Sequence, residues 1–424
     1  MRIMMLSWEF PPRVIGGLSQ HVFELSRSLA EAGNQVDVLT FCGENLPEKE
    51  TMEGINIWRV TPYHGGSERD FIDWVHRLNF ALIEKGALLC NRIGKYDLVH
   101  AHDWLVAYAG RGLKSIFRMP LLATIHATEF GRNEGLHTSN QRYISDLEWW
   151  LGYEAWKVIC CSEHMKKELQ HVFQLPEDKI AIIPNGIRPD AYEAEGIKPD
   201  IEGLSFDPEE KIVFFIGRLV QEKGVQVLLG AAPSILERFP GTKFVIAGTG
   251  PHKEHLEGLT HKLGLTENVL FCGYISDQVR NELYSLASVA VFPSLYEPFG
   301  IVALEAMISG APVVVSSVGG LEEIVEHQVD GLKAYPGDHR SLADQICRLL
   351  ENEEWAASLA EKAYQKAGTF SWDKIAQKTA EIYREIVFSS ENKRWQKQAG
   401  EEETMHTKVK VQKGKESAQV PYLI

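Results

Sequence analysis

The sequence lacks several features that would point to particular classes of protein. None of its six cysteines forms a CxxC pair, no apolar run is long enough to cross a bilayer, and no GxGxxG stretch marks a dinucleotide fold. The amino terminus shows no charged leader, apolar stretch and small-residue cleavage site of the kind that a signal peptide has. We therefore expect a cytoplasmic protein with no integral membrane segment, whose thiols are buried and reduced.

Positive charge is also scarce. The chain has 44 lysines and arginines against 58 aspartates and glutamates, a formal net charge of −14. A surface for nucleic acid or for an acidic membrane would favour a basic face, so the composition argues against both partners. Basic residues gathered in a cleft could still hold one phosphorylated ligand.

The composition is that of an ordinary globular protein. With 424 residues, of which 44% are hydrophobic, the chain can build two cores. Short apolar runs alternate with longer helix-like segments, such as the amphipathic stretch Ser19–Ala32, and this alternation is typical of mainly parallel sheets covered on both faces. The predicted strands are Ile3–Trp8, Val36–Phe41, Ile55–Val60, Leu98–Ala101, Leu121–His126, Val158–Cys161, Ile180–Pro184, Ile212–Ile216, Phe244–Ala247, Val269–Cys272, Val289–Phe292, Val313–Ser316 and Leu332–Tyr335.

The pattern divides into two halves. We predict one α/β domain over residues 1–188, a polar linker over 189–207 and a second α/β domain over 208–370. Residues 391–424 are rich in Lys, Glu and Gln and are expected to be disordered. Because ligands of open α/β sheets bind beyond the carboxyl ends of the strands, two such domains facing each other would form a deep cleft.

The most informative segment runs from Glu297 to Glu305. Pro298 suits the first turn of a helix, and Gly300 allows a ligand to approach the backbone. The free N–H groups of that first turn, with the helix dipole, would form an anion site. Glu305 then lies on an apolar helix and needs a partner, which could be ribose hydroxyls or a neighbouring element that it caps or pairs with.

Two loops at strand ends could contact the same anion. Arg218 and Lys223 follow the strand Ile212–Ile216, and they offer a planar fork and a point charge to phosphate oxygens. Gly16 and Gly17 follow the first strand and would let backbone N–H groups reach a phosphate or a sugar. Alone, either loop could equally be a solvated basic loop or a simple turn, so the interpretation depends on their combination.

Histidines follow two strands of the first half. His126 ends an apolar strand where the cleft should lie, and it is either a satisfied core residue or a functional one. His100 and His102 alternate on a strand, but no further ligands at metal spacing accompany them, so we predict no metal site. Several aromatic residues of this half could stack on an acceptor, although core packing is their commoner role: Tyr63, Trp74, Trp104, Trp149 and Trp150.

Together these motifs resemble the retaining nucleotide-sugar glycosyltransferases of family 4, which have the GT-B fold. The resemblance runs from Met1 to about Phe388 and rests on Gly16-Gly17, Pro184-Asn185-Gly186, Gly217–Gly224, Gly248–Pro251 and Glu297–Glu305. More narrowly, Trp8–Pro12, His102-Asp103-Trp104, Thr124–Arg132 and Glu148–Trp150 resemble the glycogen-synthase-like α-glucan synthases of bacteria and archaea. Glycogen synthases often carry a lysine before the Gly-Gly pair, where this sequence has Val14 and Ile15, so the donor base, ADP or UDP, stays open.

The resemblance implies two Rossmann-like doubly wound domains facing across a cleft, with a helix over 371–390 crossing back to the first domain. It implies that Arg218 and Lys223 bind the donor diphosphate and that Glu305 holds the ribose. It also implies that Glu297 and the backbone of Phe299 and Gly300 contact the donor sugar and phosphate. His126 would lie near the anomeric carbon and Asp103 near the sugar hydroxyls. The donor pocket would be lined by Gly16, Gly17 and Asn185.

The expected reaction moves a hexose, with glucose as the expected sugar, from a nucleoside diphosphate to a glycan acceptor such as an α-1,4-glucan. The resemblance implies same-face displacement with retention. No acidic DxD motif stands in the cleft-forming loops, so we expect no metal and no cofactor, with His126, Glu297, Arg218 and Lys223 as the catalytic set.

Other readings remain. The acceptor could be a lipid, a sucrose-type sugar or a small metabolite, and a nucleotide-sugar epimerase could share this architecture. A phosphorylase, an NAD-dependent oxidoreductase and an inactive binding protein are less well supported. A phosphorylase would need a pyridoxal lysine motif and an oxidoreductase a Gly-rich fingerprint, and the chain has no convincing example of either. An inactive binding protein would not be expected to combine Arg218, Lys223, Glu297 and Glu305.

Overall fold

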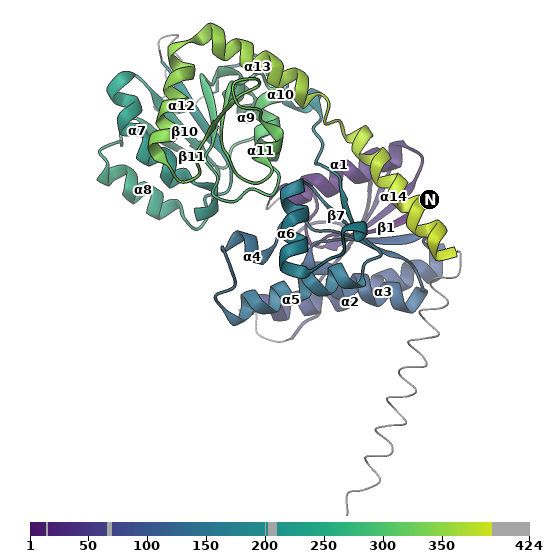
Figure 1. Cartoon of the computed structure of the whole chain (residues 1–424). Coiled ribbons are helices and arrows are strands. Elements are labelled where there is room, and N and C mark those ends of the chain that lie inside the picture. The colour runs from purple at the N-terminus through teal and green to yellow at the C-terminus, as the bar shows by residue number, and fades with distance from the viewer. Residues whose placement is uncertain (14–15, 66–69, 200, 202–209, 392–424) are drawn as a thin grey trace, which may run out of the picture.

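The computed structural model describes residues 1–13, 16–65, 70–199, 201 and 210–391. Two α/β units are visible, each with a central sheet between helices (Figure 1). Val14 and Ile15, part of the predicted linker and the tail from 392 onward lie outside the described residues, so the expected disorder of the tail is a prediction only.

The first sheet has the strand order β3-β4-β2-β1-β5-β6-β7-β8. All its pairings are parallel except that of β3 with β4. Its strands are β1 (Arg2–Leu6), β2 (Gln35–Phe41), β3 (Lys49–Met52), β4 (Ile55–Val60), β5 (Leu98–His102), β6 (Leu121–Thr124), β7 (Lys157–Cys160) and β8 (Ile180–Ile182). The sequence analysis missed β3, because this short polar edge strand has no buried apolar face to give a pattern.

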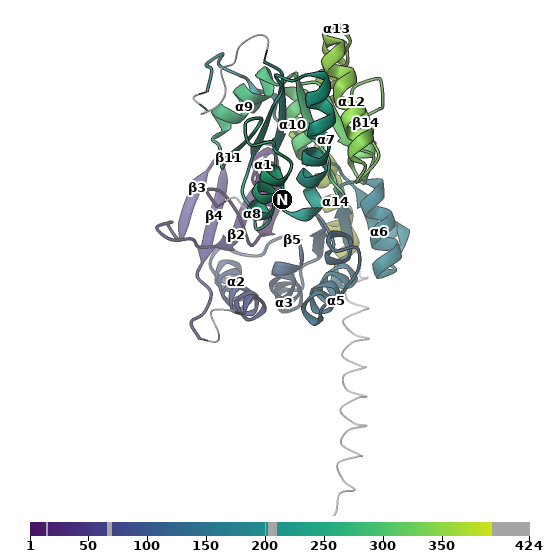
Figure 2. The ribbon, with the colours of Figure 1, turned by 90° about the vertical axis from the view of Figure 1, so that its left-hand side faces the viewer.

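Helices cover both faces of the first sheet. Met4 and Leu6 of β1 belong to the apolar cluster that includes residues of α2 and α3, whereas Ile3 and Met5 belong to the cluster formed with α1 and α14. Figure 2 shows α2, α3 and α5 on the face away from the second domain. The helices of this domain are α1 (Gly17–Glu31), α2 (Phe71–Ile93), α3 (Ala107–Phe117), α4 (Glu129–Arg132), α5 (Ser139–Glu154) and α6 (Glu163–Phe173).

The second sheet is entirely parallel, in the order β11-β10-β9-β12-β13-β14. Its strands are β9 (Ile212–Ile216), β10 (Lys243–Ala247), β11 (Val269–Gly273), β12 (Val289–Phe292), β13 (Val313–Ser316) and β14 (Leu332–Ala334). The helices are α7 (Val225–Arg238), α8 (Lys253–Lys262), α9 (Asp277–Leu286), α10 (Ile301–Ile308), α11 (Leu321–Ile324), α12 (His339–Glu351) and α13 (Glu353–Ala367). Every strand predicted from the sequence is found, with its ends shifted by at most a few residues.

The last described helix, α14 (Trp372–Glu391), returns to the first domain and packs along α1. Trp372 is buried where it begins, and a side chain on Gly186 would lie 2.6 Å from the indole ring, so that position must remain glycine. The hydroxyl of Tyr383 on this helix lies 2.8 Å from Nδ1 of His100 inside the first sheet. The expected crossing helix is therefore confirmed.

The strand order reverses direction between β1 and β5 in one sheet and between β9 and β12 in the other. Such reversals leave a crevice at the carboxyl ends of the strands, because the connections depart to opposite faces. The loops after these four strands should therefore carry the functional residues. No helix among the described residues has a run of apolar positions long enough to cross a bilayer.

Candidate active site

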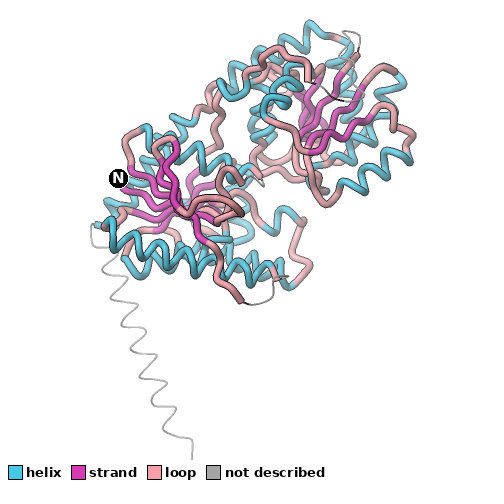
Figure 3. Tube along the Cα trace, turned by 180° about the vertical axis from the view of Figure 1, so that it is seen from behind, coloured by secondary structure: helices cyan, strands magenta, loops and turns pink. Residues whose placement is uncertain are grey.

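A cavity of about 400 Å³ is lined by loop residues of both domains. Figure 3 shows the two groups of strands, one in each domain. Both domains contribute to its wall. The predicted site residues that line it are Gly16, Gly17, Asp103, His126, Asn185, Arg218, Lys223, Glu297, Phe299 and Gly300. The structure thus brings ten of the eleven predicted residues to one cavity, and the exception is Glu305.

An ion pair stands on the second-domain wall. Lys223 Nζ lies 2.7 Å from Glu297 Oε2, and the Ser294 hydroxyl donates to the same oxygen at 3.2 Å. The pair is close because Gly224 approaches the end of β12, where a side chain would lie only 1.8 Å from the Pro293 carbonyl oxygen. The lysine is therefore held at the cavity wall by a buried carboxylate, for which it supplies the opposite charge.

Arg218 lies on the same wall, in the loop after β9. Its side chain is exposed and makes no hydrogen bond or ion pair with the described residues. Its charge is therefore available to an incoming anion, whereas that of Lys223 is shared with Glu297 until a ligand competes for it.

The helix after Glu297 begins later than the sequence suggested. Helix α10 starts at Ile301, and Gly300 precedes it as the N-cap with φ of +106°. Pro298 is therefore not in the first helical turn, and that prediction is wrong. The physical reason is Gly300, because its left-handed backbone turns the chain between Pro298 and the helix, and a side chain there would lie 2.5 Å from Leu321. Ile301 and Val302 line the cavity with Gly300, so the start of the helix still faces the expected anion site.

On the first-domain wall, Asp103 follows β5 with a φ of +59°, which is strained for a residue with a side chain. Its carboxylate accepts a hydrogen bond from the backbone N–H of His126 at 2.8 Å. Burial raises the pKa of Asp103 to about 6, against the opposing charge of Arg132. The backbone conformation and the hydrogen bond together fix the Asp103 carboxylate at the carboxyl end of β5.

His126 presents a neutral ring to the cavity. Burial and then the charge of Arg132 lower the pKa of His126 to about 3. Its Nε2 lies 3.1 Å from Nδ1 of His102, behind the cavity wall. His100, the other histidine of β5, instead contacts Tyr383 and Thr124.

Glu305 lies beside the cavity and does not line it. Its two carboxylate oxygens accept hydrogen bonds from the hydroxyls of Tyr192, at 3.0 Å, and Tyr284, at 3.3 Å. Burial raises the pKa of Glu305, and the charge of Arg280 opposes that shift. The chain itself therefore supplies partners for the buried acid, and a contact with ribose stays a prediction.

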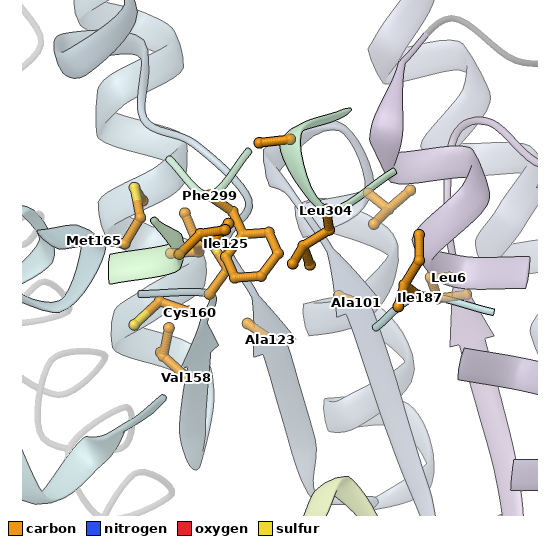
Figure 4. Close-up of a cluster of buried hydrophobic side chains, with 14 of the residues drawn as sticks. Leu6, Ala101, Ala123, Ile125, Val158, Cys160, Met165, Ile187, Phe299 and Leu304 are labelled. Carbon is orange, nitrogen blue, oxygen red and sulfur yellow. The ribbon is translucent and has the colours of Figure 1, made fainter. Parts of the chain in front are cut away.

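The segment 296–299 also joins the two domains. The Pro298 carbonyl accepts a hydrogen bond from the Ser162 hydroxyl at 2.7 Å, and the Tyr296 hydroxyl donates to Glu168 at 3.0 Å. Phe299 is buried in the same apolar cluster as Ile125 of the first domain (Figure 4). The second-domain wall is thus packed directly against the end of the first sheet.

Sequence reasoning missed several residues of this site. Gly319 and Gly320 lie against the Glu297–Phe299 backbone so closely that a side chain at either would lie 2.0–2.4 Å from it. A Gly-Gly pair shortly after the predicted strand Val313–Ser316 was a usable signal. Tyr296 and Arg132 were given no individual role. Tyr296 contacts Glu168 of the other domain, and Arg132 lies near the charges of Asp103 and Glu148, so both depend on tertiary packing.

The aromatic residues of the first domain divide by exposure. Trp104 is buried, and Trp74 and Trp150 pack at the edges of apolar clusters, in agreement with core packing. Tyr63 and Trp149 are about half exposed. Within the described residues none of these five lines the cavity.

Comparison with known proteins identifies the family of the chain. Residues 15–191 match the family described as Glycosyltransferase Family 4, and residues 197–366 match Glycosyl transferases group 1. An uncharacterized glycosyltransferase of Methanocaldococcus jannaschii is 40% identical over 91% of this chain and 98% of its own length. The glycogen synthase of Mycobacterium tuberculosis is 35% identical over 90% of this chain and 94% of its own.

Among solved structures, sucrose-phosphate synthase from Thermosynechococcus elongatus superposes with a TM-score of 0.79 and 26% identity, over 92% of this chain and 99% of that one. The chain therefore belongs to the family 4 glycosyltransferases with the GT-B fold, enzymes that use nucleotide sugars.

The raised pKa of Asp103 gives a testable pH dependence. Between about pH 4 and pH 6 the folded protein holds a proton on Asp103 that the unfolded chain has already lost, so the contribution of Asp103 to wild-type stability falls as pH rises through this window and is constant above it. The free energy of unfolding of the wild type and of Asp103→Asn can be measured with urea at pH 4 and pH 7. From pH 4 to pH 7 the wild type should lose on the order of 3 kcal/mol relative to the variant. A difference that is equal at both pH values would refute the shift.

Proposed function

We propose that this chain transfers glucose, with retention and without a metal, from a nucleoside diphosphate to an α-1,4-glucan. The observation that carries the proposal is one cavity with Arg218, Lys223 and Glu297 on its second-domain wall and Asp103 and His126 on its first-domain wall. A sugar nucleotide has two parts that match these two walls, because an anionic diphosphate is joined to a neutral sugar rich in hydroxyl groups.

The basic wall suits the diphosphate. Leaving-group departure places negative charge on the phosphate oxygens, and Arg218 is free to donate to them. Lys223 adds a second charge when phosphate displaces Glu297, and the start of α10 adds partial positive charge. These groups can take the part that a divalent ion plays in other transferases.

The opposite wall suits the sugar. At neutral pH His126 is uncharged, so it can hydrogen-bond a sugar hydroxyl without repelling the positive charge that develops at the anomeric carbon. The carboxylate of Asp103 is ionised at that pH and can accept from hydroxyls or stabilise that charge.

Same-face displacement accounts for the bonds without a protein nucleophile. The acceptor oxygen forms a bond to the anomeric carbon as the bond to the phosphate oxygen breaks. The acceptor proton passes to the departing phosphate oxygen on the same face. The domain contacts of Tyr296, Pro298 and Phe299 hold the two walls together and limit the water that would hydrolyse the donor.

The glucan acceptor is supported by the similarity to a glycogen synthase at 35% identity over nearly the whole chain. The similarity to sucrose-phosphate synthase supports a second candidate, in which a sugar phosphate is the acceptor. The two candidates share the donor site and differ in the acceptor.

A substrate panel distinguishes these candidates. We expect the protein to release nucleoside diphosphate from ADP-glucose or UDP-glucose when maltooligosaccharides are added, with products one glucose longer by mass spectrometry. Fructose 6-phosphate should not replace the oligosaccharide. EDTA should leave the rate unchanged, because the protein's own cations neutralise the leaving group. Transfer to the sugar phosphate alone would establish the second candidate, and inhibition by EDTA that Mg²⁺ reverses would contradict the metal-free mechanism.

Substitutions in the ion pair test the site. Lys223→Ala and Glu297→Ala should each lower kcat by at least about 10²–10³, since each removes or misplaces a positioned charge. Lys253→Ala, which removes an exposed lysine of α8, is the matched control and should keep the wild-type rate. Circular dichroism must show both site variants folded. Wild-type turnover in either folded variant would remove the pair from the mechanism.

A further inference from the structure

Three histidines from three elements meet behind the first-domain wall. His21 comes from α1, His102 from β5 and His126 from the loop after β6. One ring nitrogen of each lies within 4.8 Å of the others, and His21 and His102 are almost fully buried. The sequence did not suggest this group, because the three residues lie far apart in the chain and join only when α1 covers the sheet.

The hydrogen bonds of two of these rings fix which nitrogen of each carries the lone pair, although only that of His21 has no hydrogen-bond partner among the described residues. His21 Nδ1 lies 2.7 Å from Asn185 Oδ1, which can only accept, so Nδ1 carries the proton and Nε2 bears a lone pair. That Nε2 atom is buried and has no hydrogen-bond partner among the described residues. His102 Nε2 lies 2.9 Å from the weak acceptor Met5 Sδ, which leaves the lone pair of His102 on Nδ1.

The spacing of the rings suits a common ligand. His102 Nδ1 and His126 Nε2 are 3.1 Å apart, and two nitrogens bound to one tetrahedral zinc ion lie about 3.3–3.4 Å apart. One ring nitrogen of each histidine lies within 4.8 Å of the others, so movements of up to about 1.5 Å would bring the three to that separation. Burial lowers the pKa of each ring, so all three are neutral at physiological pH, the form that binds metals.

We propose that His21 Nε2, His102 Nδ1 and His126 Nε2 form a binding site for Zn²⁺, with the fourth position open toward the cavity. Asn185 and Met5 orient two of the rings, as partners behind the ligands do in zinc proteins. The site differs from the diphosphate site, which lies on the other domain. An ion bound here engages the ring of His126 and so withdraws it from the sugar.

Binding can be measured without any substrate, so the test does not depend on the proposed function. The metal-free full-length protein is dialysed against Zn²⁺, and Co²⁺ is added to a second sample as a visible reporter of tetrahedral coordination. We expect one ion per chain and a tetrahedral cobalt spectrum. His21→Gln removes the unpartnered nitrogen and should weaken binding by at least about 10-fold. His102→Ala should do the same and checks the result at a second ligand.

The double variant His252→Ala/His255→Ala is the matched control. It removes a stacked histidine pair in and beside α8 that could bind metal nonspecifically, and it should leave the affinity unchanged. Circular dichroism must show each variant folded, and His21→Gln decides the test if His102→Ala does not fold. Absence of binding, affinity unchanged in His21→Gln, or affinity lost in the control would overturn the proposal.

A second readout rests on the proposed function. In the transfer assay, Zn²⁺ should lower the wild-type rate, EDTA should restore it, and the residual rate of His21→Gln should be insensitive to the ion. Equal inhibition of the wild type and His21→Gln would contradict the withdrawal of His126, whereas a protein with no transfer activity would contradict the function and leave the dialysis result standing.

Discussion

The pairing of Lys223 with Glu297 is the interaction on which the rest of the site depends. A carboxylate that is 6% exposed needs a partner, and a lysine facing a cavity needs a counter-charge until a ligand arrives. The pair joins the loop after β9 to the loop after β12, the two strands at which the second sheet reverses its order. The closeness of these loops depends on Gly224, which has no side chain to separate them. The fold thus places two opposite charges where an anion can exchange for one of them.

The same segment explains how the two domains are joined. Directly after Glu297, the carbonyl of Pro298 and the ring of Phe299 contact the end of the first sheet, and Gly300 then starts α10. A ligand that moves Glu297 therefore acts on residues that also form the domain contact. The proposed donor site and the domain contact therefore share a few consecutive residues.

Much of the fold could be predicted from the sequence, because buried parallel strands are short apolar runs separated by helices. The strand β3 could not, since an edge strand such as Lys49–Met52 has little apolar surface to bury. Ten site residues could be predicted because they follow strands whose carboxyl ends must share one edge, or because they match family motifs. The partners of Glu305 could not, because Tyr192 lies in the predicted linker and Tyr284 on a different helix. The group formed by His21, His102 and His126 likewise depends on tertiary packing alone.

The most direct test of the account is a structure of the protein with a nucleoside diphosphate glucose bound. We expect the diphosphate within hydrogen-bonding distance of Arg218 and Lys223, with Lys223 released from Glu297 and the glucose ring between Asp103 and His126. A nucleotide bound elsewhere, with the Lys223–Glu297 pair intact, would contradict it.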